Sequence, residues 1–288
     1  MRYFNFKICC VLCLIMVNFL SGCSSSDKNI RLDKEWETLA DLKEPESVIY
    51  DSKENVIYVS NINNPAGGKD GNGSIGRISL EGDILEVDWV IGGMDAPKGL
   101  GLLNELLYVA DLNNIVVINT KNGKLQKTIE VKDSGMLNDI TIDDEGNIYV
   151  SDSDNKRIYQ IINDIAEIWL EKDFFQKPNG LLAHQGKIYM IDMDSGIFYE
   201  INKDTKALRK IAEGLVGGDG IIPFGDNFII SNWHGELNLV KSNGDIKMLI
   251  DTKADNINAA DIAYIPKHNL LLVSTFFNNK VVAYKILE

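Results

Sequence analysis

Short apolar runs that end in a polar residue recur along the chain and predict short β-strands. Six of these runs lie at residues 57–61, 107–111, 148–152, 187–192, 228–232 and 271–275. Each follows a turn and another apolar run, and these preceding runs start at residues 46, 98, 138, 179, 219 and 260. The steps between the starting positions are therefore 52, 40, 41, 40 and 41 residues.

A period of about forty residues, with about four short strands in each copy, is typical of a β-propeller. The copy that starts at residue 179 shows all four strands, because further strand-like runs follow at residues 197–201 and 207–212. Six copies predict an all-β fold, a six-bladed β-propeller of four-stranded blades that occupies residues 30–288. Tyrosines recur at one position of the second strand, at residues 58, 108, 149 and 189, and we expect them to pack between blades.

The last copy ends at residues 281–286 and lacks a fourth strand. Residues 35–40, which precede the first copy, have the pattern of this missing outer strand. We expect this N-terminal strand to pair with the last blade and to close the ring, because closure protects sheet edges that would otherwise be exposed.

The beginning of the chain has the pattern of an export signal. Arg2 and Lys7 precede an apolar run over residues 8–20, which is too short to span a membrane as a helix. We therefore predict that residues 1–22 are a signal peptide. The ending Leu-Ser-Gly-Cys, at residues 20–23, resembles the lipobox of bacterial lipoproteins.

This resemblance implies that Cys23 is lipidated and that residues 23–29 tether the propeller to a membrane. The expected location is the cell envelope of a bacterium, on the periplasmic side or at the cell surface. The alternative is an ordinary signal peptide in which the cysteine occurs by chance. Cys9, Cys10 and Cys13 would leave with the signal peptide, so the propeller itself has no thiol chemistry and no disulfide.

The charge balance narrows the range of partners. The net charge is −13 for the full chain and becomes about −15 once Arg2 and Lys7 are removed. Such an acidic surface repels phosphate backbones, so nucleic acid is excluded as an expected partner. We expect a monomer that binds a small-molecule substrate or ligand and contacts the membrane only through Cys23.

Polar residues occupy most of the positions at which the inner strands start, and in a propeller these positions converge on the axis. The six residues are Glu46, Lys98, Asn138, Asn179, Asp219 and Ala260. Carboxylate and amide oxygens are the ligands that hard cations prefer. The pattern therefore predicts a divalent-cation site with Ca²⁺ as the expected ion and Mg²⁺ or Mn²⁺ as alternatives. Zn²⁺ is a further alternative, disfavoured because the ring contains no histidine or cysteine.

Four short motifs at these positions resemble the SMP-30/gluconolactonase/LRE family of regucalcin-like lactonases. The motifs are Pro45-Glu46, Asn138-Asp139, Pro178-Asn179-Gly180-Leu181 and Asp219-Gly220. The resemblance covers essentially residues 45–288, and it extends more distantly to calcium-dependent paraoxonases and strictosidine synthase-like proteins. It implies hydrolysis of a lactone or ester.

The same resemblance assigns roles to individual residues. It implies that Glu46, Asn179 and Asp219 bind the cation and that Asp219 is the general base. Asn138 would line the substrate site and approach the ion.

Three residues depart from the pattern of the family. Ser47 stands where the family has glycine, and Met136 stands where sugar lactonases often carry a substrate-binding arginine. Lys98 can either pair with Glu46 and take the place of the ion, or polarise a substrate carbonyl or hold a carboxylate. A non-catalytic propeller of the NHL type, which binds a small ligand or an envelope protein, therefore remains the alternative function.

Further residues are expected at the same end of the channel. Trp233 and His234 are candidates for a wall of the ligand site, with residues 276–277 opposite them, and the glycine-rich loop over residues 62–74 is a candidate lid. A second set of polar residues ends the second strands, at residues 61, 111, 152, 192, 232 and 275, and we expect these to hold tight turns. His184 and His268 fall on the opposite face and receive no role.

Overall fold

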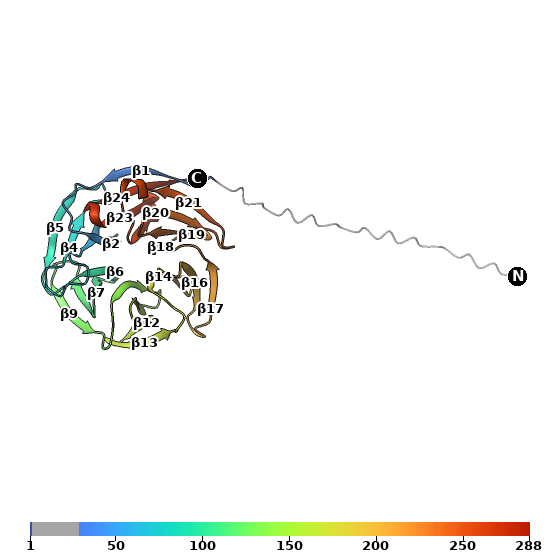
Figure 1. Ribbon diagram of the computed structural model, residues 1–288, viewed down its shortest axis with the longest axis horizontal. Helices are drawn as coiled ribbons and strands as arrows, with labels where there is room; N and C mark the ends of the chain where they lie inside the picture. The colour runs from blue at the N-terminus through green and yellow to red at the C-terminus, as the bar shows by residue number, and fades with distance from the viewer. Residues whose placement is uncertain (2–28) are drawn as a thin grey trace.

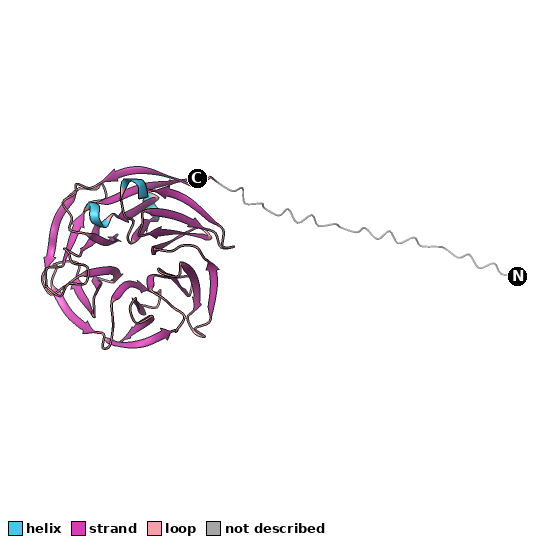
Figure 2. Cartoon of the chain, viewed as in Figure 1, coloured by secondary structure: helices cyan, strands magenta, loops and turns pink. Residues whose placement is uncertain are grey.

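The protein is an all-β, six-bladed propeller in a computed structural model that describes residues 29–288 together with Met1 (Figure 1). Strands dominate the described residues, and helix is confined to short 3₁₀ turns (Figure 2). The predicted signal peptide and Cys23 lie outside the described residues. Within the described part of the chain, no helix combines the length and the apolar character needed to cross a membrane.

The first three blades follow one another along the chain as antiparallel sheets, each built from the axis outward. Blade 1 comprises β2 (Pro45–Asp51), β3 (Val56–Asn61), β4 (Ser74–Ile78) and β5 (Ile84–Ile91). Blade 2 comprises β6 (Pro97–Leu103), β7 (Leu106–Asp111), β8 (Asn114–Asn119) and β9 (Leu125–Glu130). Blade 3 comprises β10 (Leu137–Ile142), β11 (Ile148–Asp152), β12 (Arg157–Ile162) and β13 (Ile165–Glu171).

The remaining blades continue the same order until the last strand. Blade 4 comprises β14 (Pro178–His184), β15 (Lys187–Asp192), β16 (Ile197–Asn202) and β17 (Leu208–Ala212). Blade 5 comprises β18 (Gly218–Phe224), β19 (Asn227–Asn232), β20 (Glu236–Val240) and β21 (Ile246–Asp251). Blade 6 comprises β22 (Ile262–Ile265), β23 (Leu270–Ser274), β24 (Val281–Leu287) and β1 (Arg31–Glu37). Three 3₁₀ turns flank its strands: η1 (Lys253–Asp255), η2 (Pro266–His268) and η3 (Phe276–Asn278).

The N-terminal strand closes the ring, as the sequence predicts. β1 pairs antiparallel with β24, in a register that runs from Arg31 opposite Leu287 to Glu37 opposite Val282. Figure 1 shows this blue strand lying along the outside of the red C-terminal blade. The strand starts earlier than the expected residues 35–40, because residues 31–34 also pair with β24, and it ends at Glu37 rather than at residue 40.

The core consists of seams between neighbouring blades, which explains why the inner strands are apolar on both faces. Among the described residues, six apolar clusters join the six pairs of adjacent blades. Tyr58 packs with Leu100 and Leu107 of the next blade, and the other three recurring tyrosines occupy the corresponding seams. The prediction that these tyrosines pack between blades is confirmed.

Candidate functional site at the channel mouth

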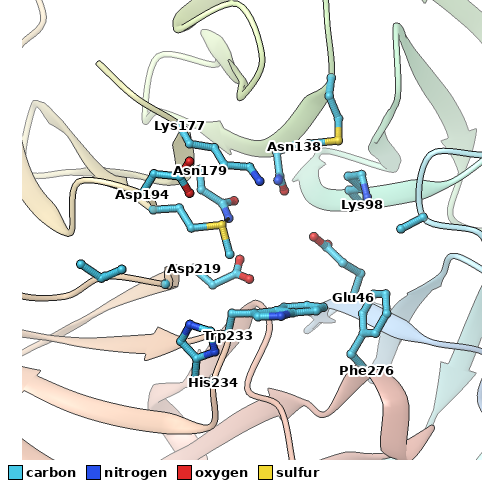
Figure 3. A pocket seen from close by; sticks show the side chains of 15 residues that line it. Glu46, Lys98, Asn138, Lys177, Asn179, Asp194, Asp219, Trp233, His234 and Phe276 are labelled. Atoms are coloured by element: carbon cyan, nitrogen blue, oxygen red, sulfur yellow. Dashed lines mark hydrogen bonds between the residues drawn. The ribbon is translucent and has the colours of Figure 1, made fainter. Parts of the chain in front are cut away.

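The polar ring of the sequence comes together at one end of the central channel. Glu46, Lys98, Asn138, Asn179 and Asp219 are each the second residue of an inner strand, in β2, β6, β10, β14 and β18. All five line a single cavity of about 420 Å³ (Figure 3). The sixth position differs, since Ala260 precedes β22 and does not line the cavity.

A β-bulge aims each of these five side chains. In each of the five blades, the register between the first and second strands shifts immediately after the first paired residue, for example between Pro45 and Val48. A bulge of this kind bends the strand and redirects a side chain. The side chain of Glu46 therefore faces the mouth of the channel. In β22 no such shift is present.

Most candidate site residues of the propeller line this cavity, whereas Ala260 and Phe277 do not. Met136, Trp233 and His234 line it together with the five ring residues, and Ala66 of the predicted lid loop also reaches it. The wall residues that sequence reasoning did not single out are Lys177, Met193, Asp194, Val216 and Gly217. Two of these wall residues could have been found from the sequence. Lys177 and Gly217 stand two residues before a ring residue, the same position that Met136 occupies.

Two buried oxygens in the ring lack a hydrogen-bond partner among the described residues. These are Oε2 of Glu46 and Oδ1 of Asn179. The amide nitrogen of Asn179 donates to the sulfur of Met193 at 3.5 Å, which leaves the carbonyl oxygen turned away from that contact. Buried acceptors without partners are costly, so a group that accepts their lone pairs is expected here.

The donor set suits a hard divalent cation. The carboxyl groups of Glu46 and Asp219 point toward the same space in Figure 3, with Asn179 beside them. Oxygen donors of this type favour Ca²⁺, Mg²⁺ or Mn²⁺. In the described part of the chain, no three His, Cys, Asp or Glu side chains gather to hold a metal. The candidate set would instead combine two carboxylates with the amides of Asn138 and Asn179.

Lys98 does not close the ring by pairing with Glu46. The residue is 95% buried, yet within residues 29–288 its amine has no ion-pair or hydrogen-bond partner. Its charge still acts at a distance, since it favours the ionised forms of Glu46 and Asp219. The amine is therefore left facing the cavity.

Burial raises the pKa of four carboxyl groups in the channel. The pKa of Glu46 and that of Asp219 are held well above their usual values by burial, and neighbouring carboxylates add to the effect. Asp139 and Asp261 form a second layer, which the sequence did not assign to the site. Burial also raises the pKa of Asp139, and it raises the pKa of Asp261 to about 6.

Hydrogen bonds hold this second layer in place. Asp139 accepts from the backbone N–H of Ile140 at 2.7 Å and from that of Leu181 at 2.6 Å. Asp261 accepts from the backbone N–H of Ile262 at 2.7 Å and from the hydroxyl of Ser47. Ser47, where the sequence departs from the family pattern, thus has a partner in the neighbouring blade.

Gly220 makes room for Asp261 between blades 5 and 6. A Cβ at residue 220 would lie 2.4 Å from Oδ1 of Asp261, closer than any side-chain carbon can approach. The glycine of the Asp219-Gly220 motif is therefore required by close approach rather than by a turn.

Replacing Asp261 with asparagine should flatten the pH dependence of stability. The unfolded aspartate ionises near pH 4, whereas the folded one ionises at about pH 6. The folded state thus keeps a proton that the unfolded chain has released, and the free energy of unfolding falls as the pH rises through this window, by at most about 3 kcal/mol. We expect thermal melting from pH 4 to 7 to show a smaller decline in Asp261→Asn than in the parent protein. An equal decline in both would contradict the assignment.

The second set of polar residues holds turns, as predicted. Asp111 accepts from the backbone N–H groups of Asp95 and Ala96, and Asp152 accepts from that of Met136 at 3.0 Å. Asp192 accepts from the backbone N–H of Lys177 at 2.9 Å. These bonds position the loops that carry Met136 and Lys177 into the cavity.

An aromatic cluster forms one wall of the mouth. The rings of Trp233 and Phe276 pack edge to face with centroids 4.8 Å apart, and Phe276 packs in the same way on Phe277 at 4.7 Å. Phe276 is buried, whereas Phe277 is 63% exposed at the rim. The predicted aromatic wall is present, although Trp233 and Phe276 lie side by side rather than on opposite sides.

No known family model matches the chain, and no curated protein matches it either. Among solved structures it resembles a catalytically inactive histidine-to-alanine variant of virginiamycin B lyase from Staphylococcus aureus with quinupristin. That match has 14% identity and a TM-score of 0.63 over 90% of this chain and 100% of the other.

Two further structures show the same likeness. A streptogramin B lyase has 12% identity and a TM-score of 0.64, over 90% of this chain and 98% of that chain. A nidogen/laminin complex has 19% identity and a TM-score of 0.64, over 76% of this chain and 84% of that chain. At these identities the likeness shows the fold alone, so the resemblance to regucalcin-like lactonases is not confirmed by a family match. The chain has the six-bladed propeller fold that these structures share.

Proposed function

We propose that the channel mouth binds a divalent cation and hydrolyses a lactone or ester. The observation that carries the proposal is the pair of buried, unpartnered oxygens on Glu46 and Asn179, beside the carboxyl group of Asp219 in a cavity of about 420 Å³. Glu46, Asn179 and Asp219 would hold the ion, and Asn138 would approach it. When bound, the cation would polarise the carbonyl of the substrate.

The side chains of the protein supply the remaining chemistry. Asp219 takes a proton from the attacking water, whose oxygen adds to the carbonyl carbon. The C–O bond to the leaving group then breaks, and the leaving oxygen takes up that proton. The amine of Lys98 favours the ionised form of Asp219, which keeps that carboxylate able to accept the proton.

Calorimetric titration of the full-length protein with Ca²⁺, Mn²⁺ and Zn²⁺ tests the cation site. We expect one ion per chain, with Ca²⁺ as the preferred metal, and at least about a hundredfold weaker binding by Glu46→Gln, since a carboxylate ligand is lost. Glu54→Gln, an exposed change in the β2–β3 turn of the same blade, is the matched control and should bind like the parent. Absence of binding by the parent would leave a non-catalytic ligand-binding propeller as the better reading.

A lyase is the second candidate. It is favoured because a propeller of this fold is inactivated by loss of one histidine, and His234 is the histidine that lines the cavity here. As a base, His234 would remove a proton from carbon while a neighbouring C–O bond breaks to leave a C=C bond. Turnover in ¹⁸O-labelled water separates the two reactions, because hydrolysis adds one labelled oxygen to the products and elimination adds none.

We further propose that Cys23 anchors the propeller to the bacterial envelope. Cys23→Ser should move the protein from the membrane fraction to the soluble fraction and abolish labelling by a fatty-acid analogue, because the acyl chains can no longer be attached. Cys13→Ser, a change inside the predicted signal peptide, should leave both unchanged. Membrane association that persists in Cys23→Ser would contradict the lipid anchor.

A further inference from the structure

We propose that the site selects a ligand with two unlike ends, a carboxylate or similar anionic group on one side and an aryl or acyl group on the other. This inference rests on the proposed function for the reacting carbonyl, but the recognition itself involves neither bond breaking nor bond formation. The ligand would be an amphipathic ester or lactone rather than a polyhydroxylated sugar lactone.

Two unpaired amines form the cationic side of the cavity. Lys98 is 95% buried, and Lys177 is partly buried in the loop before β14. Across residues 29–288, neither amine has a hydrogen-bond or ion-pair partner, although both line the cavity. Burying a charged group without a partner is unfavourable, so the arrangement calls for an anionic group from outside the chain.

The opposite side is apolar. Trp233 and Phe276 line the cavity, and Val216 adds an aliphatic side chain that is 55% exposed. Phe277 packs on Phe276 and extends the aromatic cluster beyond the cavity lining. Aromatic and aliphatic groups of this kind bind apolar surface and offer few hydrogen bonds. A sugar with a hydroxyl on every carbon would leave most of its hydroxyls unpaired against this wall.

The reacting groups lie between the two sides. In Figure 3, Lys98, Asn138 and Lys177 border one part of the cavity, with Asp194 beside Lys177, and Trp233, His234 and Phe276 border the facing part. Glu46, Asn179 and Asp219 occupy the space between them. A ligand with its anionic end at the lysines and its apolar end at the aromatic wall would therefore place its middle, where an ester or lactone carbonyl belongs, over the polar ring.

Binding of small matched probes to the full-length protein tests this inference without turnover. The probes are 3-phenylpropionate, its amide, propionate and D-gluconate, measured by calorimetry in buffer that contains calcium chloride. We expect 3-phenylpropionate to bind at least about tenfold more tightly than each of the other three, since each lacks the anionic or the aryl end. Equal binding of 3-phenylpropionate and its amide, tighter binding of D-gluconate, or no binding of 3-phenylpropionate would overturn the inference.

Three substitutions should separate the two preferences. Lys98→Met should remove the preference for the acid over the amide and keep the preference for the aryl group, and Lys177→Met, in a less buried position, should weaken the acid preference. Trp233→Leu should remove the preference for the aryl group and keep the preference for the acid over the amide. Lys124→Met, in an exposed turn of the same blade as Lys98, is the charge-matched control and should bind like the parent.

The outcome also distinguishes this inference from the proposed function. Selective probe binding without turnover of any lactone or ester would support the recognition and overturn the hydrolase. Hydrolysis of a sugar lactone without selective probe binding would support the hydrolase and overturn the recognition.

Discussion

Asp219→Asn is expected to reduce hydrolytic turnover by about a thousandfold. The substitution removes the group that accepts the proton and one of the proposed cation ligands, while the side chain keeps its shape. Initial rates on a panel of lactones and aryl esters, with the preferred cation in excess, measure the effect. Asp226→Asn, the same exchange in the exposed β18–β19 turn of the same blade, should retain the activity of the parent.

The stability of Asp219→Asn provides a separate check that activity is not lost through unfolding. Burial and the nearby charges of Asp261 and Asp139 raise the pKa of Asp219, so its ionised form destabilises the cation-free protein. The neutral asparagine relieves this repulsion, and the cation-free variant should melt no lower than the parent at neutral pH. Full activity in Asp219→Asn would exclude this residue as the base.

Removal of residues 2–44 is expected to lower the melting temperature by on the order of 10 °C. The deletion removes β1, which leaves the edge of β24 unpaired and uncovers the apolar cluster against which Trp36 packs. Unpaired strand edges also template association, so the shortened chain should form oligomers. Differential scanning calorimetry and light scattering measure the two effects.

A chain that lacks only residues 2–28 is the control for this deletion. It keeps the whole of β1 and should melt at the temperature of the parent. If the longer deletion melted at that temperature as well, closure by β1 would contribute nothing to stability.

The architecture was predictable because the sequence pattern of one blade is repeated six times along the chain. The repeat that starts at Glu46, Lys98 and the equivalent positions places an inner strand in every blade. Because no fourth strand follows residues 281–286, the strand-like pattern of residues 35–40 identified the missing outer strand. The exact extent of β1 was not predictable, since residues 31–34 are mostly exposed and pair through their backbone. Such pairing leaves little trace in side-chain type.

The candidate site was predictable only in its first layer. Ring residues such as Asn179 stand at equal positions in the repeat, so they could be read as one group. Asp261 was missed because the ring position of the last copy is Ala260, and nothing in the sequence shows that the next residue meets Ser47 across the seam between blades 6 and 1. The bulges that aim the ring residues also depend on backbone register, which the residue pattern does not record.

The pairing of β1 with β24 joins the first strand of the propeller to its last strand. Blades 1 to 5 are complete within residues 45–251, but β1 has no partner until Val281–Leu287 are available. The propeller therefore stays open at its last seam until β24 has been made, and closing the ring requires two segments that lie far apart in the sequence to dock, a step that we expect to be slow because of the long loop that it closes. A fusion partner placed directly after Glu288 would sit at that seam and compete with this last step.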